Sequence, residues 1–172
     1  MGYGTMTELS RTIWIDAPVD EVFAFMDEPA NQPRITPSMT RIENIERLEN
    51  GGSKSDYTYR FFGVPFRGSV HALEYRPNKR IVFEVTGAVV GKIRWDFGEK
   101  GGGTDFTYYA QYEMPFPILS RVFSSLINAY NEREIDQLTE ALKRVIEEGR
   151  RKESAAGAKG AGGRGGSGRS VR

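Results

Sequence analysis

The most regular pattern in this chain is a helical one near its carboxyl end. Apolar residues recur there three or four positions apart, which predicts the buried side of a long helix over Phe116–Glu148: Leu119, Val122, Phe123, Leu126, Ile127, Tyr130, Leu138, Ala141, Leu142 and Val145. Pro117 suits a first turn, and Gly149 stands where a helix usually stops. Such a helix, roughly 45–50 Å long, needs a large partner because isolated helices are marginal in water. The apolar stripe is interrupted at Asn131 and Glu134, which indicates a cavity beside the helix.

Most of the remaining chain alternates apolar and polar residues with a period of two, which predicts strands. Short turn sequences such as Asn50-Gly51-Gly52 separate them, so we expect an antiparallel meander. One strand is predicted at Leu9–Asp16 and six more at Arg41–Leu48, Lys54–Phe62, Phe66–Tyr75, Arg80–Thr86, Val89–Gly98 and Thr104–Met114.

A short helix and a loop separate the first strand from the other six. Pro18, Asp20 and Glu21 favour a helix start, because proline and carboxylates suit a first turn. The buried face of this helix is predicted from its apolar residues: Val19, Val22, Phe23 and Met26. Three prolines between Glu28 and Met39 predict a loop with at most one helical turn.

Together these elements predict an α+β fold. A seven-stranded antiparallel sheet has one apolar face, and the long helix is the only element large enough to cover it. We therefore expect a strongly curved sheet wrapped around the carboxyl-terminal helix, with the short helix after the first strand.

Charge divides the 172-residue chain into two parts. Residues 149–172 contain eight glycines, seven Lys/Arg, one Glu and no aromatic residue, a net charge of +6. Residues 1–148 carry 17 Lys/Arg and 22 Asp/Glu, a net charge of −5. We expect one ligand-binding domain over 1–148 and a disordered, basic, glycine-rich tail over 149–172, because the tail has too little apolar surface to offset its ordering entropy. Weak contact with anionic surfaces is expected of the tail, and specific nucleic-acid binding is not, since no aromatic residues lie between its arginines.

Residue content excludes several chemistries. The chain has no cysteine, which rules out disulfides, thiolate catalysis and cysteine metal sites. His71 is the single histidine, so a multi-histidine metal site is impossible, and no metal or cofactor is expected. There is no apolar run of about 18 residues and no amino-terminal signal segment, so we expect no transmembrane segment and a cytoplasmic location.

Aromatic residues alternate along three of the predicted strands. We place one set on a shared inner surface: Tyr57, Tyr59, Trp95, Tyr108 and Tyr112. Each could be an ordinary core residue, but buried tyrosine hydroxyls need hydrogen-bond partners. Four tyrosines on one concave face are easier to satisfy beside a ligand or a water-filled pocket, and ligand pockets are typically apolar with a few polar groups.

Three further candidates lie where the helical stripe is broken: Tyr130, Asn131 and Glu134. If Glu134 faces the sheet, desolvation would raise the pKa of its carboxyl group and suit it to general acid–base catalysis. If the helix is rotated slightly, Glu134 lies in solvent beside Arg133 or Gln137. Asn131 would hydrogen-bond either a ligand carbonyl or a tyrosine hydroxyl.

The remaining charged candidates have simpler interpretations. Arg60, Arg67 and Arg94 are expected as solvated charges on the outer face of the sheet. His71 lies on a strand whose pattern does not decide its face, and a surface or structural role is expected for it.

Three motifs resemble a known family. They are the strand-to-helix segment Ile13–Phe23 followed by Asp27, the strand–turn–strand segment Leu73–Ile81, and the final helix with Leu138, Leu142 and Lys143 near its end. From Leu9 to Glu148 the chain resembles the START-like superfamily, also called SRPBCC, helix-grip or Bet v 1-like, and within it the polyketide cyclase/dehydrase and lipid-transport branch.

The resemblance implies a binding module that holds a hydrophobic small molecule, such as a lipid, an isoprenoid or an aromatic polyketide, between the sheet and the long helix. The alternative it implies is a cyclase or dehydrase that uses Glu134 and a pocket tyrosine as acid and base. No catalytic signature is present, so enzymatic activity is left open. A third alternative is an accessory protein that binds a partner through the pocket rim and the tail.

Overall fold

The structure, a computed structural model, describes residues 6–113 and 121–161. Within these residues all seven predicted strands are present, with ends a few positions from those expected. The elements in chain order are β1 (Met6–Ile15), α1 (Val19–Asp27), the 3-10 helix η1 (Pro29–Asn31), α2 (Gln32–Ile35), β2 (Met39–Arg47), β3 (Ser53–Phe61), β4 (Val64–Arg76), β5 (Arg80–Gly87), β6 (Val90–Lys100), β7 (Gly103–Glu113) and α3 (Arg121–Ala161).

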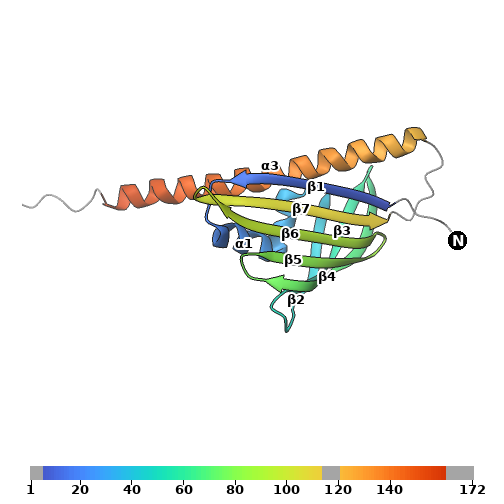
Figure 1. The fold of residues 1–172 in the computed structure, drawn as a ribbon, viewed down its shortest axis with the longest axis horizontal. Coiled ribbons are helices and arrows are strands. Elements are labelled where there is room, and N and C mark those ends of the chain that lie inside the picture. The colour runs from blue at the N-terminus through green and yellow to red at the C-terminus, as the bar shows by residue number, and fades with distance from the viewer. Residues whose placement is uncertain (1–5, 114–120, 162–172) are drawn as a thin grey trace, which may run out of the picture.

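The strands form one antiparallel sheet in the order β1-β7-β6-β5-β4-β3-β2. From β2 to β7 each strand pairs with the next one in sequence. β1 pairs with β7, so β1 and β2 form the two edges of the sheet. Figure 1 shows the curved sheet with α3 running along it beside β1. This arrangement confirms the predicted α+β helix-grip fold.

Three glycines occupy positions in the sheet where the neighbouring strand leaves no room for a side chain. Gly68 of β4 lies directly opposite Gly87 at the end of β5, and Gly91 lies at the start of β6, after the β5–β6 turn. A Cβ at position 68 would stand 2.2 Å from the Thr86 carbonyl oxygen, and one at position 91 would stand 2.1 Å from that of Gln111. Side chains at these positions would force the backbones apart, so the glycines permit the sheet to bend here.

The main core fills the space between the carboxyl-terminal half of α3, α1 and the adjoining part of the sheet. Its fully buried members include Ile15, Val22, Phe106 and Leu142. The apolar residues predicted on α3 between Leu138 and Val145 pack in this core. The space beside the amino-terminal half of α3 is therefore where a cavity can remain.

The predicted end of the long helix is wrong. Instead of stopping at Gly149, α3 continues to Ala161, so the first part of the segment expected to be disordered is helical. A glycine inside a helix costs only about 1 kcal/mol. Immediately after it, Arg150 forms an ion pair with Glu21 of α1 at 3.0 Å, and alanines follow. Residues 162–172 lie outside the described part of the chain, as do Phe116 and Pro117 at the predicted helix start.

The buried stripe of α3 is also displaced from the predicted one. Its buried positions step by three or four residues through Ile127, Asn131, Ile135, Leu138, Leu142 and Ile146. Leu126, predicted to be inside, is 53% exposed, because it lies about 100° around the helix from Ile127. Two buried residues of the stripe, Ile135 and Ile146, were missing from the prediction.

The connection between α1 and β2 contains more helix than expected. Two short turns, η1 and α2, occupy it instead of at most one. Pro29 and Pro33 each lie in the first residues of one of these turns, a position where a missing N–H has no cost.

Candidate ligand-binding site

A cavity of about 200 Å³ lies between the concave face of the sheet and α3. Residues from all seven strands form one wall, α3 forms the opposite wall, and Gln32 and Thr36 of the α2 region contribute a third side. Its lining is predominantly apolar and includes Leu9, Met26, Ile42, Phe61, Phe66, Val70, Phe83, Val85, Ile93, Ala110, Ile135 and Leu138.

Seven of the eight predicted ligand-binding residues line this cavity: Tyr57, Tyr59, Trp95, Tyr108, Tyr112, Asn131 and Glu134. The eighth, Tyr130, lies at its edge and packs edge-on against Phe61, with ring centroids 4.7 Å apart. The Tyr130 hydroxyl is 2.8 Å from the Ser38 hydroxyl and 3.2 Å from the Arg60 carbonyl oxygen. The structure therefore brings the predicted residues together in one place.

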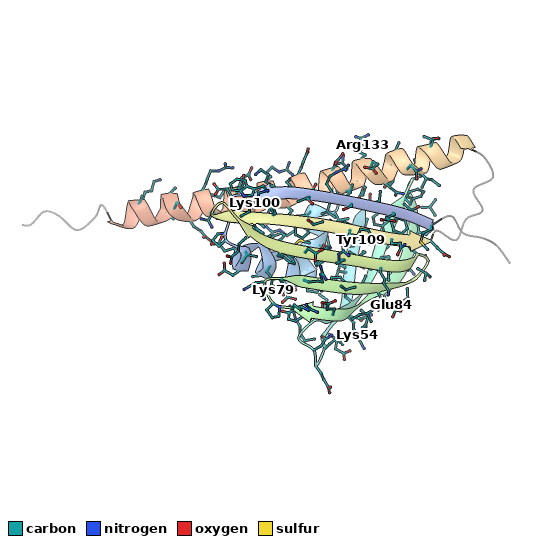
Figure 2. The ribbon with its side chains drawn as sticks, viewed as in Figure 1. Lys54, Lys79, Glu84, Lys100, Tyr109 and Arg133 are labelled. Carbon is teal, nitrogen blue, oxygen red and sulfur yellow. The ribbon has the colours of Figure 1, made fainter. Side chains whose placement is uncertain are left out.

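Strand alternation explains why the aromatic residues converge. On β7, Tyr108, Ala110 and Tyr112 line the cavity, whereas the intervening Tyr109 lies on the outer face of the sheet (Figure 2). Its ring there lies 4.7 Å from the guanidinium carbon of Arg94. Because side chains alternate with a period of two, each strand contributes every second residue to the cavity wall.

Burial disfavours ionisation of the cavity tyrosines and raises their pKa values. It raises the pKa of Tyr57 to about 12. Burial is also the main cause of the raised pKa values of Tyr59 and Tyr108, and in both cases the nearby Glu134 carboxylate adds to the effect. The pKa of Tyr112 is raised by burial, then by Tyr108 and Glu134. At neutral pH these side chains can donate and accept hydrogen bonds, but they do not carry charge.

Glu134 faces the cavity, as one of the two interpretations of the sequence required. Its two carboxylate oxygens accept hydrogen bonds from the Ser38 backbone N–H at 3.2 Å and from the Ser38 hydroxyl at 2.9 Å. The carboxylate is thus partnered at the cavity wall. Through it, the connection between α2 and β2 is fastened to α3.

Three polar atoms of cavity-lining residues are buried without a hydrogen-bond partner among the described residues. They are the Tyr57 hydroxyl, the Trp95 indole nitrogen and the Asn131 amide nitrogen. Leaving a buried donor unsatisfied costs about 1–3 kcal/mol, and most buried polar groups in folded proteins are satisfied. Because no group among the described residues partners these atoms, a ligand or water inside the cavity would supply the missing hydrogen bonds.

Several polar residues of the site, Thr36 among them, were missed by the sequence prediction. Ser53 and Ser55 are 5% and 3% exposed and line the cavity. Both lie on the same face of β3 as Tyr57, so the period of two could have located them. Gln32 and Ser38 lie in the proline-rich connection, where no periodicity indicates which side chains point inward.

The remaining charged candidates lie outside the cavity. His71, Arg60 and Arg67 are exposed, while Arg94 is half-buried and forms an ion pair with Asp96 at 2.8 Å. Within residues 6–113 and 121–161, no three histidine or carboxylate side chains are grouped so that they could hold a metal ion.

The family model for polyketide cyclase/dehydrase and lipid transport matches residues 6–147. The chain belongs to this family. The matched range contains every strand of the sheet and every cavity residue named above, which confirms the resemblance carried by the sequence motifs. No curated protein matches the sequence significantly.

Solved structures share the fold at low sequence identity. A protein of Thermus thermophilus is 18% identical, with a TM-score of 0.73 over 83% of this chain and 99% of that one. The Zhui aromatase/cyclase of a Streptomyces species is 14% identical, with a TM-score of 0.71 over 83% and 94% of the two chains. A START superfamily protein of Mycobacterium smegmatis is 14% identical, with a TM-score of 0.68 over 82% and 97%.

In the part of the chain that the structure describes, no helix combines the length and apolarity needed to cross a lipid bilayer.

Proposed function

We propose that this protein binds a compact apolar molecule that carries hydroxyl or carbonyl oxygens. The observation that carries the proposal is the set of three unsatisfied polar atoms, from Tyr57, Trp95 and Asn131, in an otherwise apolar cavity. An apolar body would bury against the cavity wall, and its oxygens would hydrogen-bond the indole N–H and the amide. Family membership supports the same class of function.

Cavity size narrows the three ligand classes suggested by the sequence. Ligand pockets usually measure about 300–1,000 Å³, and this cavity measures about 200 Å³. A one- or two-ring aromatic compound or a short isoprenoid fits that space better than a long-chain lipid. We therefore place an aromatic or short isoprenoid ligand ahead of a long-chain lipid.

Two measurements test the proposal. Native mass spectrometry of the gently purified full chain should show a bound small molecule in part of the population. Fluorescence titration with 1-naphthol, and competition by farnesol and palmitate, should then rank the ligand classes. Ala110→Leu, which adds volume inside the cavity, should weaken naphthol binding at least severalfold. Gln111→Leu, which changes the neighbouring residue on the other face of β7, should leave naphthol binding unchanged. Equal naphthol affinity of the two variants would show that the cavity is not the binding site.

The alternative function is a cyclase or dehydrase. It is favoured by Glu134, because its carboxylate lines the cavity together with the neutral Tyr59. In that case Glu134 and a tyrosine would move protons on a bound β-ketone. Glu134→Gln should then abolish turnover of a linear β-triketone while naphthol binding survives. In a pure binding protein no turnover occurs, and Glu134→Gln leaves naphthol binding nearly intact.

The role of the carboxyl-terminal segment is a separate proposal. We propose that residues 1–148 fold and bind ligand without it, and that the segment contacts anionic surfaces weakly. Residues 151–159 are exposed and contain Arg151, Lys152 and Lys159 against the single carboxylate of Glu153. A chain ending at residue 149 should retain naphthol binding, and loss of binding would contradict this division. A cytoplasmic location also stays a prediction, testable by cell fractionation.

A further inference from the structure

Four large apolar side chains are exposed at one end of the molecule. Phe62, Val64, Val90 and Leu126 are each 53–56% exposed, and we call them the apolar rim. Phe62 lies in the β3–β4 turn, and Val64 and Val90 begin β4 and β6. Leu126 lies near the amino end of α3. In an antiparallel sheet the β3–β4 turn and the start of β6 lie at the same end, beside the amino end of α3 (Figure 1).

Two contacts link the elements that carry the rim. The Phe62 ring lies 5.0 Å from the ring of Tyr130, one helical turn beyond Leu126. The backbone N–H of Ala88, in the β5–β6 turn, donates to the Arg67 carbonyl of β4 at 3.0 Å. Three separate projections, two turns and a helix end, are thereby held together around the end of the cavity where Phe61, Phe66 and Val89 line it.

Phe62 occupies a backbone conformation that phenylalanine does not favour. It has a φ of +47°, followed by Gly63 at +80°, in a two-residue turn between the paired residues Phe61 and Val64. Such turns prefer Asn-Gly, because asparagine tolerates positive φ better than bulky residues do. The Phe62 ring packs against Phe61 and Tyr130, with centroids 4.7 and 5.0 Å away, yet the side chain stays 56% exposed. The turn geometry does not favour this residue, whereas a surface that needs an apolar tip would.

Two cations accompany the rim. The Arg60 guanidinium donates to the Gly63 carbonyl oxygen at 3.5 Å, which places it over the β3–β4 turn, and Arg67 is exposed on the adjoining strand. Neither forms an ion pair with any described residue, although the domain as a whole is acidic. Asp56 lies on the strand paired with Arg67, two positions from its partner Thr58, but its carboxylate accepts hydrogen bonds from Asn44 and Ser69.

We propose that the apolar rim, with Arg60 and Arg67, docks this protein onto anionic lipid bilayers. Projecting apolar side chains would enter the boundary between headgroups and acyl chains, and the unpaired arginines would meet lipid phosphates. A protein partner fits less well, since the rim consists of separate projecting tips instead of a groove. Docking would bring the cavity next to the apolar molecules that a bilayer contains. That role for docking rests on the proposed ligand-binding function, but docking itself can be tested without any ligand.

The test is sedimentation of the full chain with vesicles of phosphatidylcholine, with and without about one-third phosphatidylglycerol. The wild-type chain should bind the anionic vesicles, and raising the salt from about 50 mM to about 500 mM should weaken binding. Arg67→Gln should weaken it about fivefold. Phe62→Asn should weaken it at least fivefold while the chain still unfolds cooperatively on heating, because asparagine suits the positive φ and offsets part of the lost ring contacts with Phe61 and Tyr130.

Matched controls lie away from the rim. The control variants are Leu73→Asn and Arg144→Gln, which should leave vesicle binding unchanged. Leu73 is 48% exposed on β4, and Arg144 is exposed on α3.

The proposal is overturned if the wild-type chain does not bind anionic vesicles, if it binds both vesicle types equally, or if Phe62→Asn binds like Leu73→Asn. It is also overturned if removal of residues 150–172 alone abolishes binding, which would assign the contact to the tail. Naphthol binding by Phe62→Asn without vesicles should match wild type, so failure of docking and failure of the ligand proposal are distinguishable.

Discussion

The Tyr57 side chain lies over Gly68, its partner across β3 and β4, so closely that a Cβ at position 68 would stand 2.5 Å from the tyrosine hydroxyl oxygen. Tyr57 lines the cavity, and its hydroxyl is one of the three unsatisfied polar atoms. The absence of a side chain at position 68 therefore determines where the Tyr57 ring can lie. A residue that never touches the ligand would in this way help to shape its site.

Gly68→Ala should disturb both the cavity and the sheet. The new Cβ would meet the Tyr57 ring and, at 2.2 Å, the Thr86 carbonyl oxygen, so we expect the free energy of unfolding to fall by about 1–3 kcal/mol and naphthol binding to weaken. Urea denaturation and fluorescence titration measure the two effects. Gly98→Ala is the matched control, since its Cβ would find only the Asp105 carbonyl oxygen at 3.8 Å. Similar behaviour of the two variants would show that the backbone accommodates the added Cβ.

The buried tyrosines predict a stability that falls in alkaline solution. Their pKa values are raised in the folded protein, Tyr57 to about 12, above the value of about 10 expected for unfolded chains. The stabilisation is therefore complete below pH 10 and is lost as the pH rises through the folded-state values. Absorbance of tyrosinate near 295 nm should show fewer ionised tyrosines at pH 11 in the native protein than in urea.

Replacement of Tyr57 by phenylalanine provides the comparison for this titration. Tyr57→Phe removes one of the hydroxyls with a raised pKa. The free energy of unfolding of this variant should therefore fall less between pH 10 and pH 12 than that of the wild-type chain. Full ionisation of all tyrosines near pH 10, with the fold intact, would show that these hydroxyls are hydrated in solution.

The contact between Ser38 and Glu134 predicts a measurable coupling. Ser38→Ala removes the hydroxyl that donates to the Glu134 carboxylate at 2.9 Å and leaves the backbone N–H contact, so we expect a loss of about 1–2 kcal/mol. Glu134→Gln keeps an acceptor and should cost less. A double-mutant cycle on urea denaturation should give a coupling energy of at least about 0.5 kcal/mol; strictly additive effects would mean that the two side chains are not partnered in solution.

The strands and the cavity wall were predictable because period two is a purely local signal. Tyr108, Ala110 and Tyr112 alternate with outward residues, and any strand at this place would put them on one side of the sheet. The long helix was located by the same kind of argument. Its detailed face was not, because Leu126 and Ile127 are both apolar, and only packing against the sheet decides that Ile127 is buried and Leu126 exposed.

Contacts between distant segments could not be predicted from local pattern. The hydroxyl of Ser38 meets Glu134, 96 residues away, and Arg150 meets Glu21, 129 residues away. Each contact depends on how α2 or α1 docks against α3. The second also contributes to the misplaced helix end, since Gly149 is a local stop signal that tertiary contact and the following alanines override.

Asn131 gives the sharpest separation of stability from function. It is 5% exposed in the middle of the buried stripe of α3, and its amide nitrogen has no partner among the described residues. Asn131→Leu keeps the branched shape and the number of side-chain heavy atoms, and its larger methyl groups can extend into the cavity. Because it removes an unsatisfied donor, the free energy of unfolding without ligand should rise by about 1–2 kcal/mol. The midpoint of thermal unfolding should rise by several degrees.

The same Asn131→Leu variant should bind oxygen-bearing ligands less well. Loss of one hydrogen bond of about 0.5–1.5 kcal/mol predicts a severalfold weaker affinity for 1-naphthol, while naphthalene, which lacks the hydroxyl, should bind at least as well as to the wild-type chain. Asn128→Leu, the same change at an exposed position of α3, should alter neither affinity. A lower unfolding free energy in Asn131→Leu would mean that the amide is already hydrogen-bonded in the wild-type chain. An unchanged naphthol affinity would show that Asn131 does not contact the ligand, which would leave the Trp95 indole and the Tyr57 hydroxyl to recognise it.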